Sequence, residues 1–282
     1  MFNCEYDVLN IPTNENKEIN EQYEKESVGN YYKSIDYKTS SSINNYIKKM
    51  GISKTAFFLT IYGYVLSKFS KQDIIYSSII SANRNNHYTE NMVGMFASTQ
   101  PILLKYNEKQ ISFNEQIKNI MNVLMELYNY QDISYSELVG DIKLKNVNNA
   151  FIYQPKTYTS NEEENSLIYV NDDEHEFNVF DDINSDNSNT TKFDISFDVI
   201  ENENDYTVFI EYNKKKFEQR LVEKILNCYI EVVNNVDSFI NTIQQIEYIP
   251  KEEKNRILYE FNNNHYEYEF NKLYHTEFSK VA

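Results

Sequence analysis

Four histidines are the side chains of this 282-residue sequence whose usual pKa lies closest to neutral pH, which makes them the first candidates for acid–base chemistry. They stand at positions 87, 175, 265 and 275, and no two are adjacent. His175 lies in the acidic run DDEHEF, which lacks the ligand spacing of a metal site, so a solvated loop histidine is favoured over a metal ligand. His265 and His275 lie beyond residue 261, in a polar stretch that we interpret as a linker.

His87 is the histidine nearest the most unusual loop, VGMFASTQPILLK at residues 93–105, which contains one of only five glycines in the chain. No serine or cysteine nucleophile motif accompanies this histidine, although such a pair is the usual sign of acyl-transfer chemistry. A surface-loop histidine is therefore the favoured interpretation. An independent acyltransferase that uses His87 is the alternative.

Other patterns for catalysis or cofactor binding cannot be written from the sequence. The five glycines form neither a Walker motif nor a dinucleotide-binding fingerprint. Cys4 and Cys228 have no metal or redox spacing, and Cys228 is interpreted as a small buried hydrophobe. Carboxylate pairs are abundant, but their spacing selects none of them. No catalytic residue and no metal site are predicted.

The charge of the chain excludes some classes of partner. The formal net charge is −16, which argues against nucleic acid, whose phosphates need clustered Lys and Arg, and against an anionic membrane surface. Between Glu162 and Asp186 lie ten acidic residues and no basic one, a pattern typical of a solvated loop. The start of the chain has no secretory signal pattern, and the apolar segment TAFFLTIYGYVL is shorter than the roughly 20 residues that cross a bilayer. We expect a cytoplasmic protein.

Hydrophobic periodicity predicts the elements that would position such side chains. Helices are expected over 40–51 (with a Ser cap and Gly51 at its end), 53–70, 112–131 (behind a Ser cap with Glu115), 218–236 and 251–261 (after Pro250). Strands are expected over 73–81, 101–106 and 149–155, followed by a β-hairpin over 192–217. The helix over 53–70 is expected to bury one face, made of Phe57, Phe58, Ile61, Val65 and Phe69. The mixture of alternating elements and a hairpin favours an α/β (α+β) layered fold, with a mixed sheet flanked by helices.

Several motifs, in one order along the chain, resemble the condensation domains of nonribosomal peptide synthetases. Ala82-Asn83-Arg84 resembles the family's Ala-Gly-Arg or Ala-Asn-Arg signature, and VGMFASTQPILLK resembles its Ile-Gly-x-Phe-Val-Asn-Thr-x-x-x-Arg motif. YQDISYSELV is similar to His-Gln-Asp-x-Pro-Phe-Glu, and NVNNAFIYQ to Arg-Asn-Pro-Leu-Phe-x-x-x-Phe. KFDISFDV and IEYNKKKFEQRLVEKI resemble the closing strand, hairpin and helix. LNIPTNENK resembles a lead-in linker, EEKNRILYEFNN the linker to an adenylation domain, and KLYHTEFSKVA the first adenylation helix.

The resemblance implies a chloramphenicol-acetyltransferase-like lobe. In the family two such lobes form a V, and a tunnel between them admits two carrier-bound pantetheine arms. The family's catalytic signature, His-His-x-x-x-Asp-Gly, belongs to the first half of the domain and does not occur in this sequence. The resemblance therefore implies a C-terminal half, with a missing N-terminal condensation lobe, peptidyl carrier proteins and an adenylation domain as partners. Phosphopantetheine would be presented by the carrier proteins, and no cofactor would be bound directly.

The resemblance also selects residues for the substrate tunnel or the interface between lobes. Ser98, Lys105 and Tyr130 stand where the family has Asn, Arg and His, and Ser134-Tyr135 replaces its Pro-Phe pair. Gly94 would permit a close backbone approach or a positive φ. Whether this loop only shapes the floor between the lobes or also touches substrate is left open. The full set is Arg84, Gly94, Phe96 (expected to anchor the loop in the core), Ser98 and Thr99 (hydroxyls at the lobe surface), Gln131, and Asp132 (expected to cap a loop).

The resulting expectation divides the chain into three parts. Residues 1–40 are a linker or extended lead-in, residues 41–248 are the C-terminal lobe of a condensation domain, and residues 249–282 are the condensation–adenylation linker with the start of an adenylation domain. The predicted function is a partial condensation domain that contributes to amide-bond formation and is inactive alone. The alternative is a non-catalytic module that docks a carrier protein or a lobe, or a truncated gene product.

Overall fold

The computed structural model describes residues 2, 4–13, 27–81, 88, 92–94, 96–131, 133–156, 191–263 and 273–281. The chain divides into two units, Met1–Tyr248 and Ile249–Ala282. The first unit contains a six-stranded sheet with the strand order β1-β6-β5-β4-β2-β3. Its strands are β1 (Val28–Ile35), β2 (Ile74–Ser81), β3 (Ser98–Lys105), β4 (Asn149–Gln154), β5 (Ile195–Glu201) and β6 (Tyr206–Asn213).

The sheet is mixed, as predicted. Strand β4 runs parallel to both β2 and β5, whereas β1–β6, β5–β6 and β2–β3 are antiparallel pairs. The β5–β6 pair is the hairpin expected over 192–217. Parallel strands need a crossover connection, which a helix between two strands provides, whereas antiparallel strands can be joined by a tight turn. A chain that has both kinds of connection therefore forms a mixed sheet.

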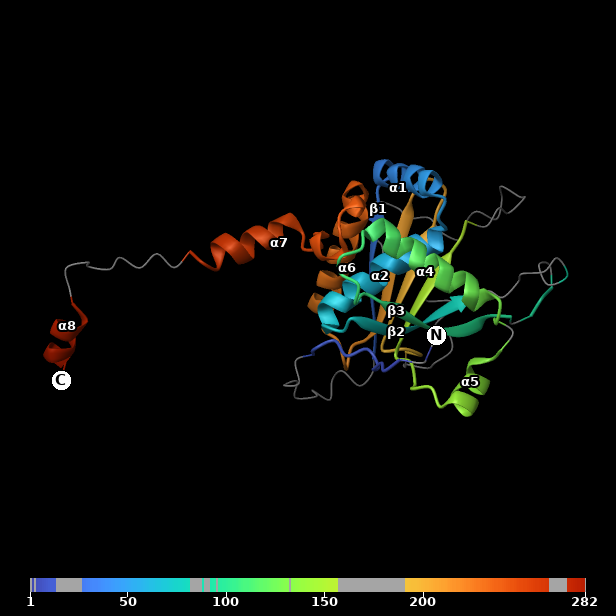
Figure 1. Ribbon diagram of the computed structural model, residues 1–282, viewed down its shortest axis with the longest axis horizontal. Helices are drawn as coiled ribbons and strands as arrows, with labels where there is room; N and C mark the ends of the chain where they lie inside the picture. The colour runs from blue at the N-terminus through green and yellow to red at the C-terminus, as the bar shows by residue number, and fades with distance from the viewer. Residues whose placement is uncertain are drawn as a thin grey trace. The chain divides into compact units, whose positions relative to one another are not determined.

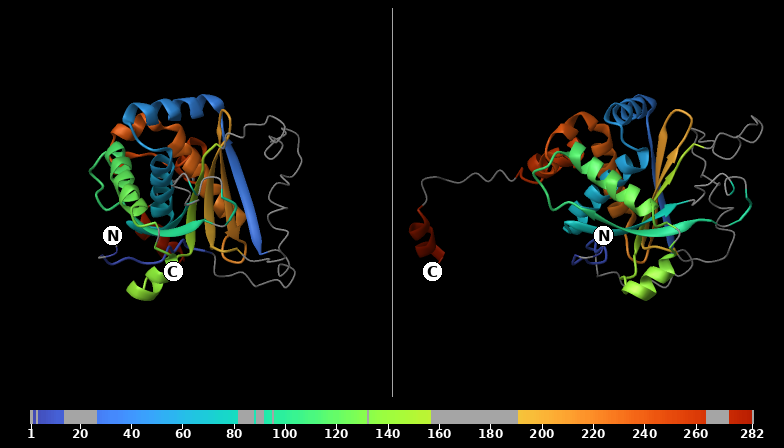
Figure 2. Two further views of the ribbon diagram at one scale, coloured as in Figure 1. Left: turned by 90° about the vertical axis from the view of Figure 1, so that its right-hand side faces the viewer. Right: turned by 45° about the vertical axis from the view of Figure 1, so that its right-hand side comes forward.

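Helices gather on one side of this sheet (Figures 1 and 2). They are α1 (Tyr37–Met50), α2 (Lys54–Ser70), α4 (Phe113–Tyr128) and α6 (Gln219–Asn234), and α5 (Tyr135–Ile142) lies beside β3. One continuous core joins the helices to the sheet residues that face them. The prediction of a mixed sheet flanked by helices is confirmed.

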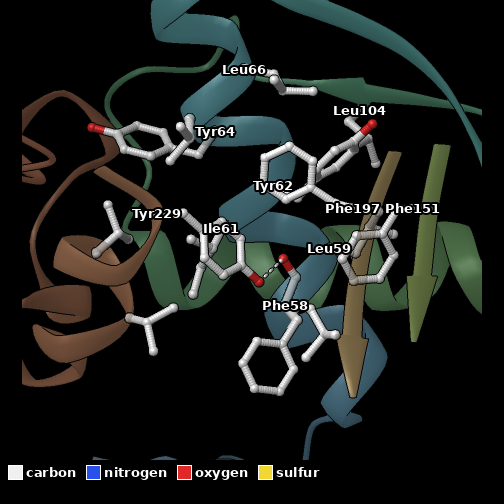
Figure 3. Close-up of a cluster of buried hydrophobic side chains, with 14 of the residues drawn as sticks. Phe58, Leu59, Ile61, Tyr62, Tyr64, Leu66, Leu104, Phe151, Phe197 and Tyr229 are labelled. Carbon is white, nitrogen blue, oxygen red and sulfur yellow. Dashed lines mark hydrogen bonds between the residues drawn. The ribbon is translucent and has the colours of Figure 1, made fainter. Parts of the chain in front are cut away.

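Helix α2 runs through the middle of this core. It begins as expected behind Ser53, whose side chain accepts a hydrogen bond from the backbone N–H of Ala56. Every residue from Ala56 to Leu66 is buried, because α4, α6 and the sheet surround the helix. The residues expected on one apolar face are buried or, for Phe69, half-buried against the core, and the burial extends around the rest of the helix. In Figure 3, Tyr62 lies toward Phe151 and Phe197 of the sheet, while the hydroxyl of Tyr229 on α6 donates to the Phe58 carbonyl on another side.

Two boundaries and one strand differ from expectation. Helix α1 begins at Tyr37, three residues before the expected residue 40. Its cap is Asp36 rather than a serine, and the Asp36 side chain accepts from the backbone N–H of Thr39. Its end at Gly51, in the left-handed region with φ 64°, is confirmed. Strand β3 begins at Ser98, earlier than the expected residue 101. Strand β1 was not predicted at all, and it occupies part of the segment that was expected to be an extended lead-in.

The second unit contains two short helical segments. Helix α7 (Lys251–Asn255) follows Pro250 as expected and continues into a π-helical turn, Arg256–Glu260. Helix α8 spans Tyr274–Val281. None of the described helices in either unit has the combination of length and apolar character that spanning a bilayer requires.

Candidate functional site

The motif residues that the structure describes lie at the start of β3 and just after α4. Gly94 has a φ of 158°, and a Cβ added there would lie 3.2 Å from the Phe96 ring. Phe96 itself is half-buried, and its role as an anchor of the loop stays a prediction. Arg84 and Asp132 lie outside the described residues.

A glutamine that was not singled out joins the two described parts of the motif. The Gln100 side chain is 2% exposed, and its amide nitrogen donates to Ser98 Oγ at 2.7 Å and to the carbonyl of Gln131 at 3.0 Å. The same nitrogen lies 3.3 Å from the carbonyl of Ile133. Ser98 and Gln131 are thus brought together, 33 residues apart in sequence, through a third side chain. The signal for it was a glutamine placed directly before the apolar run PILL.

Ser98 and Thr99 point to opposite faces of the sheet, because successive residues of a strand alternate. Ser98 shares a face with Gln100, Ile102 and Leu104, and the last two belong to the core under the helices. Thr99 lies on the other face. Both hydroxyl residues are half-buried. We call this other face, opposite α2, α4 and α6, the second face of the sheet.

Strand register arranges the second face in rows that cross all six strands. The row through Thr99 passes through residues that are paired in turn across each ladder: Thr99 (β3), Ile80 (β2), Ile152 (β4), Asp198 (β5), Phe209 (β6) and Tyr32 (β1). A second row contains Pro101, Ser78, Ala150, Ser196, Glu211 and Asn30. The first row is apolar apart from Thr99 and one carboxylate, Asp198.

Asp198 has the most unusual environment on the second face. The residue is 9% exposed, and its Oδ1 atom is buried with no hydrogen-bond partner among the described residues. Burial and the nearby charge of Glu211 raise the pKa of Asp198 to about 7, although a hydrogen bond with the Gln154 side chain opposes this shift. Burial also raises the pKa of Glu211. In the sequence, nothing distinguishes these two carboxylates from other polar residues of alternating strands.

One corner of the second face is covered by the N-terminal segment. The rings of Phe2 and Tyr6 pack on Tyr76, with centroids 6.1 and 4.9 Å away, and the Tyr76 hydroxyl donates to the Lys145 carbonyl. Lys145 in turn donates to Asp7 Oδ1 at 2.6 Å. Phe2 and Tyr6 are therefore packed onto the sheet at this corner.

A separate polar network lies at the ends of β4 and β5, on the helix side. The carboxylate of Glu201 pairs with Lys54, the first residue of α2, and accepts a hydrogen bond from the Tyr153 hydroxyl at 2.5 Å. Burial would raise the pKa of Glu201, but the hydrogen bonds from Lys54 and Tyr153 outweigh it and hold that pKa below its usual value. Each group in this network has a partner, so its role is to fix the start of α2 against the sheet.

The other candidates contribute no site. Cys228 is buried, as interpreted, and His275 is an exposed residue of α8; His87, His175 and His265 lie outside the described residues. Within the described ranges no three metal-ligating side chains gather. Two grooves, of about 340 Å³ between β3 and α4 and about 550 Å³ beside α1, contain none of the predicted site residues.

Relatives of known identity are large synthetases. The chain is 26% identical over 278 residues to gramicidin S synthase 2 of Brevibacillus brevis, and this match covers 93% of the chain and 6% of the synthase. It is 23% identical over 265 residues to bacitracin synthase 3 of Bacillus licheniformis, covering 93% of the chain and 4% of that protein. The chain therefore spans only a small part of the length of these relatives.

Solved structures show the same fold. A four-domain nonribosomal peptide synthetase bound to AMP and glycine superposes with a TM-score of 0.67 at 15% identity, covering 80% of this chain and 18% of that one. The condensation domain of a monacolin K polyketide synthase gives a TM-score of 0.65 at 13% identity, covering 86% of this chain and 55% of that one. The family model that matches is described as the condensation domain, and it matches residues 1–258. Since that match covers most of the chain, the chain belongs to the condensation domain family.

Proposed function

We propose that this chain supplies the C-terminal lobe of a nonribosomal peptide synthetase condensation domain, and that it contributes to amide-bond formation only together with a lobe that carries the paired histidines. One observation carries the proposal: the fold matches a solved condensation domain over 86% of this chain but only 55% of that domain, and the sequence has no adjacent histidines. A single sheet with helices on one side is also what one of two lobes would contain.

The reaction requires a nucleophile and a leaving group that both come from outside this chain. The amine of the acceptor attacks the thioester carbonyl carbon of the donor, a C–N bond forms, and the C–S bond to the donor's pantetheine breaks. The amine loses a proton and the departing thiolate gains one. The phosphopantetheine arms arrive on carrier proteins as part of the substrates, so this chain needs no cofactor of its own.

The contribution of this chain is positional. Gln100 holds the start of β3 against the turn after α4 through Ser98 and the carbonyls of Gln131 and Ile133. Thr99 then lies at the end of the apolar row on the second face. In this proposal the motif forms the floor of the passage between the lobes, with Arg84 and Asp132 as further members. The motif contains a carboxylate and two hydroxyl groups but no pairing of a nucleophile with a base. Such a set of residues suits the positioning of a substrate rather than catalysis of bond formation.

The same proposal assigns the rest of the chain. Residues 41–248 form the lobe, with β1 from the preceding residues 1–40 completing its sheet. Residues 249–282 join it to an adenylation domain, whose first helix is α8. The partners are then peptidyl carrier proteins, an N-terminal condensation lobe and an adenylation domain, in the cytoplasm.

Reconstitution tests the proposal directly. The full chain is mixed with an N-terminal lobe that carries the His-His-x-x-x-Asp-Gly motif, preferably the product of an adjoining upstream reading frame, and carrier proteins loaded with aminoacyl groups. We expect a complex by gel filtration and amide product by mass spectrometry only when both lobes are present. Mutation of the second histidine of the partner lobe is the matched control and should abolish product.

Two outcomes would contradict this function. Product from the chain alone would contradict the need for a partner lobe and would favour the His87 acyltransferase, to be checked with His87→Ala. A stable complex that never forms product, with lobes of several synthetases, would favour the non-catalytic docking module.

A further inference from the structure

The second face of the sheet carries two carboxylates for which no described residue supplies a positive charge. Asp198 and Glu211 lie on neighbouring strands, and because Asp198 is paired with Phe209 and Glu211 with Ser196, the two are diagonal neighbours. Diagonal residues of an antiparallel pair have side chains about 7 Å apart at their base, within reach of one small ligand between them. Neither carboxylate takes part in an ion pair with a described Lys or Arg.

A buried and incompletely bonded carboxylate oxygen is the second observation. Asp198 Oδ1 has no hydrogen-bond partner in the described part of the chain, although the residue is nine-tenths buried. Buried polar atoms are nearly always paired, and leaving one unpaired costs about 1–3 kcal/mol. An exception of this kind in a family whose substrates carry amines therefore indicates a missing hydrogen-bond donor.

The side chains around Asp198 indicate what kind of molecule carries the missing hydrogen-bond donor. Along its row, Asp198 is flanked by Ile152 on β4 and Phe209 on β6, with Ile80 and Tyr32 beyond them. Gln154 provides a side-chain amide beside the carboxylate. The row thus presents one carboxylate among apolar side chains. This arrangement fits a ligand with a positively charged nitrogen attached to an apolar group.

We propose that Asp198 and Glu211 form an ammonium-binding subsite, which holds the protonated primary amine of an amino acid substrate while Ile152, the half-buried neighbour of Asp198 on β4, contacts its side chain. The inference rests on the proposed function for the identity of the amine, because a condensation reaction consumes one. Three N–H donors of a primary ammonium can serve both carboxylates at once. A divalent cation fits less well, since Mg²⁺ and Ca²⁺ require six or more oxygen ligands and the described residues offer no cluster of three acidic or histidine ligands here.

The subsite does not perform the chemistry. An amine must be neutral to attack a thioester, so the proton held at Asp198 has to leave before the C–N bond forms. Asp198 is thus a positioning residue, which selects and orients the amine, and the paired histidines of the other lobe remain the reacting groups. Loss of Asp198 should raise the KM for the acceptor more than it lowers kcat.

Binding to the full chain alone tests the subsite without any partner lobe. Phenylalaninamide, which has a primary ammonium and an apolar ring, is titrated against the isotope-labelled protein, and chemical shifts of Ile152, Asp198 and Phe209 are followed. N-acetylphenylalaninamide, the same body without the charge, is the matched ligand control. We expect saturable shifts with the amine and none with the acetylated compound.

Three variants distinguish amine binding at this subsite from a general effect of the negative charge of the protein. Asp198→Asn should weaken amine binding by about tenfold or more, the loss expected for one charge-assisted hydrogen bond, and Glu211→Gln should weaken it by less. Asp141→Asn, the same change at an exposed residue of α5, should leave binding unchanged. A melting curve of each variant verifies that it is folded.

Several results would overturn the subsite. These are equal binding of the acetylated compound, unchanged binding by Asp198→Asn, an equal loss in Asp141→Asn, or displacement of the amine by millimolar Mg²⁺. Because this experiment contains no partner lobe, failure here with successful reconstitution would reject the subsite alone. Amine binding without any condensation in the reconstitution would reject the proposed function and leave the subsite standing.

Discussion

Replacing Asp198 with asparagine should stabilise the protein increasingly as the pH rises from 5.5 to 8. The carboxyl of Asp198 has a pKa of about 7 in the folded chain, against a usual value of 3.8, because burial and the charge of Glu211 disfavour its ionised form. A group whose pKa is raised on folding binds its proton more tightly in the folded state. The folded state therefore loses stability as the pH rises from about 4 through about 7, and asparagine does not titrate.

The size of the effect follows from the two pKa values. At about 1.4 kcal/mol for each pH unit, the difference between 7 and 3.8 corresponds to at most about 4 kcal/mol above pH 7, of which roughly half has already developed by pH 5.5. Glu211 is the charged neighbour of Asp198 across the β5–β6 pair, and Gln154 is its polar neighbour on β4, so part of this energy is shared with Glu211.

Urea unfolding of the wild-type chain and of Asp198→Asn at pH 5.5, 6.5, 7.5 and 8.5 measures this difference. We expect the advantage of the variant to grow by about 2 kcal/mol across the series and to level off above pH 7.5. Asp141→Asn, the same exchange at an exposed residue of α5, is the control for replacing a carboxylate with an amide. A difference that stays constant with pH, or a variant that is less stable than the wild type at pH 8.5, would refute the reasoning.

Four further substitutions test the packing and the backbone conformation of the lobe. Gln100→Leu removes the hydrogen bonds to Ser98, Gln131 and Ile133, so it should destabilise the lobe by about 1–3 kcal/mol and speed amide hydrogen exchange in the turn after α4. Gly51→Ala places a side chain on a residue with φ 64° where no atom is nearby, and it should lower the free energy of unfolding by about 1 kcal/mol. Gly140→Ala, in the open surroundings of α5, should leave the stability unchanged or raise it slightly. Thermal unfolding of the two variants distinguishes backbone strain at Gly51 from the helix propensity of alanine at Gly140. Gly63→Ala would place a methyl group 2.6 Å from Leu104 and from the Tyr106 hydroxyl, and should cost about 1–3 kcal/mol by urea unfolding; an unchanged midpoint would show that α2 can move away from β3.

Helix positions could be predicted well from the sequence where one face is apolar. Helix α4 begins behind Ser112, whose side chain accepts from the backbone N–H of Glu115, as the capping pattern indicated. Helix α2 shows the limit of the same method. Its tyrosines look half-polar in sequence, but the hydroxyls of Tyr62 and Tyr64 find partners at Asn149 and at the Ile246 carbonyl, so these residues are buried completely. Periodicity cannot reveal partners that lie 87 and 182 residues away.

The candidate site was predictable only in its local part. The motif around Gly94 and Phe96 could be recognised because its residues are contiguous. Asp198 could not, because its significance depends on Glu211 across the hairpin, on Gln154 across a parallel pair, and on burial of the face they share. From sequence alone, an aspartate in a strand is expected to face solvent, and only the order of the strands in the sheet shows that this one is buried.

The pairing of β1 with β6 has a consequence for how the protein is made. Their ladder joins Val28 to Asn213, so β1 leaves the ribosome 185 residues before β6, its partner in the described sheet, is complete. At 5–20 residues per second, β1 waits for roughly 10–40 s as an unpaired strand. During that time its backbone is a template for other nascent chains, and Asn30, Lys33 and Ser34 are the kind of polar side chains that discourage such pairing. The polar composition that hid this strand from sequence analysis is therefore also what protects it during synthesis.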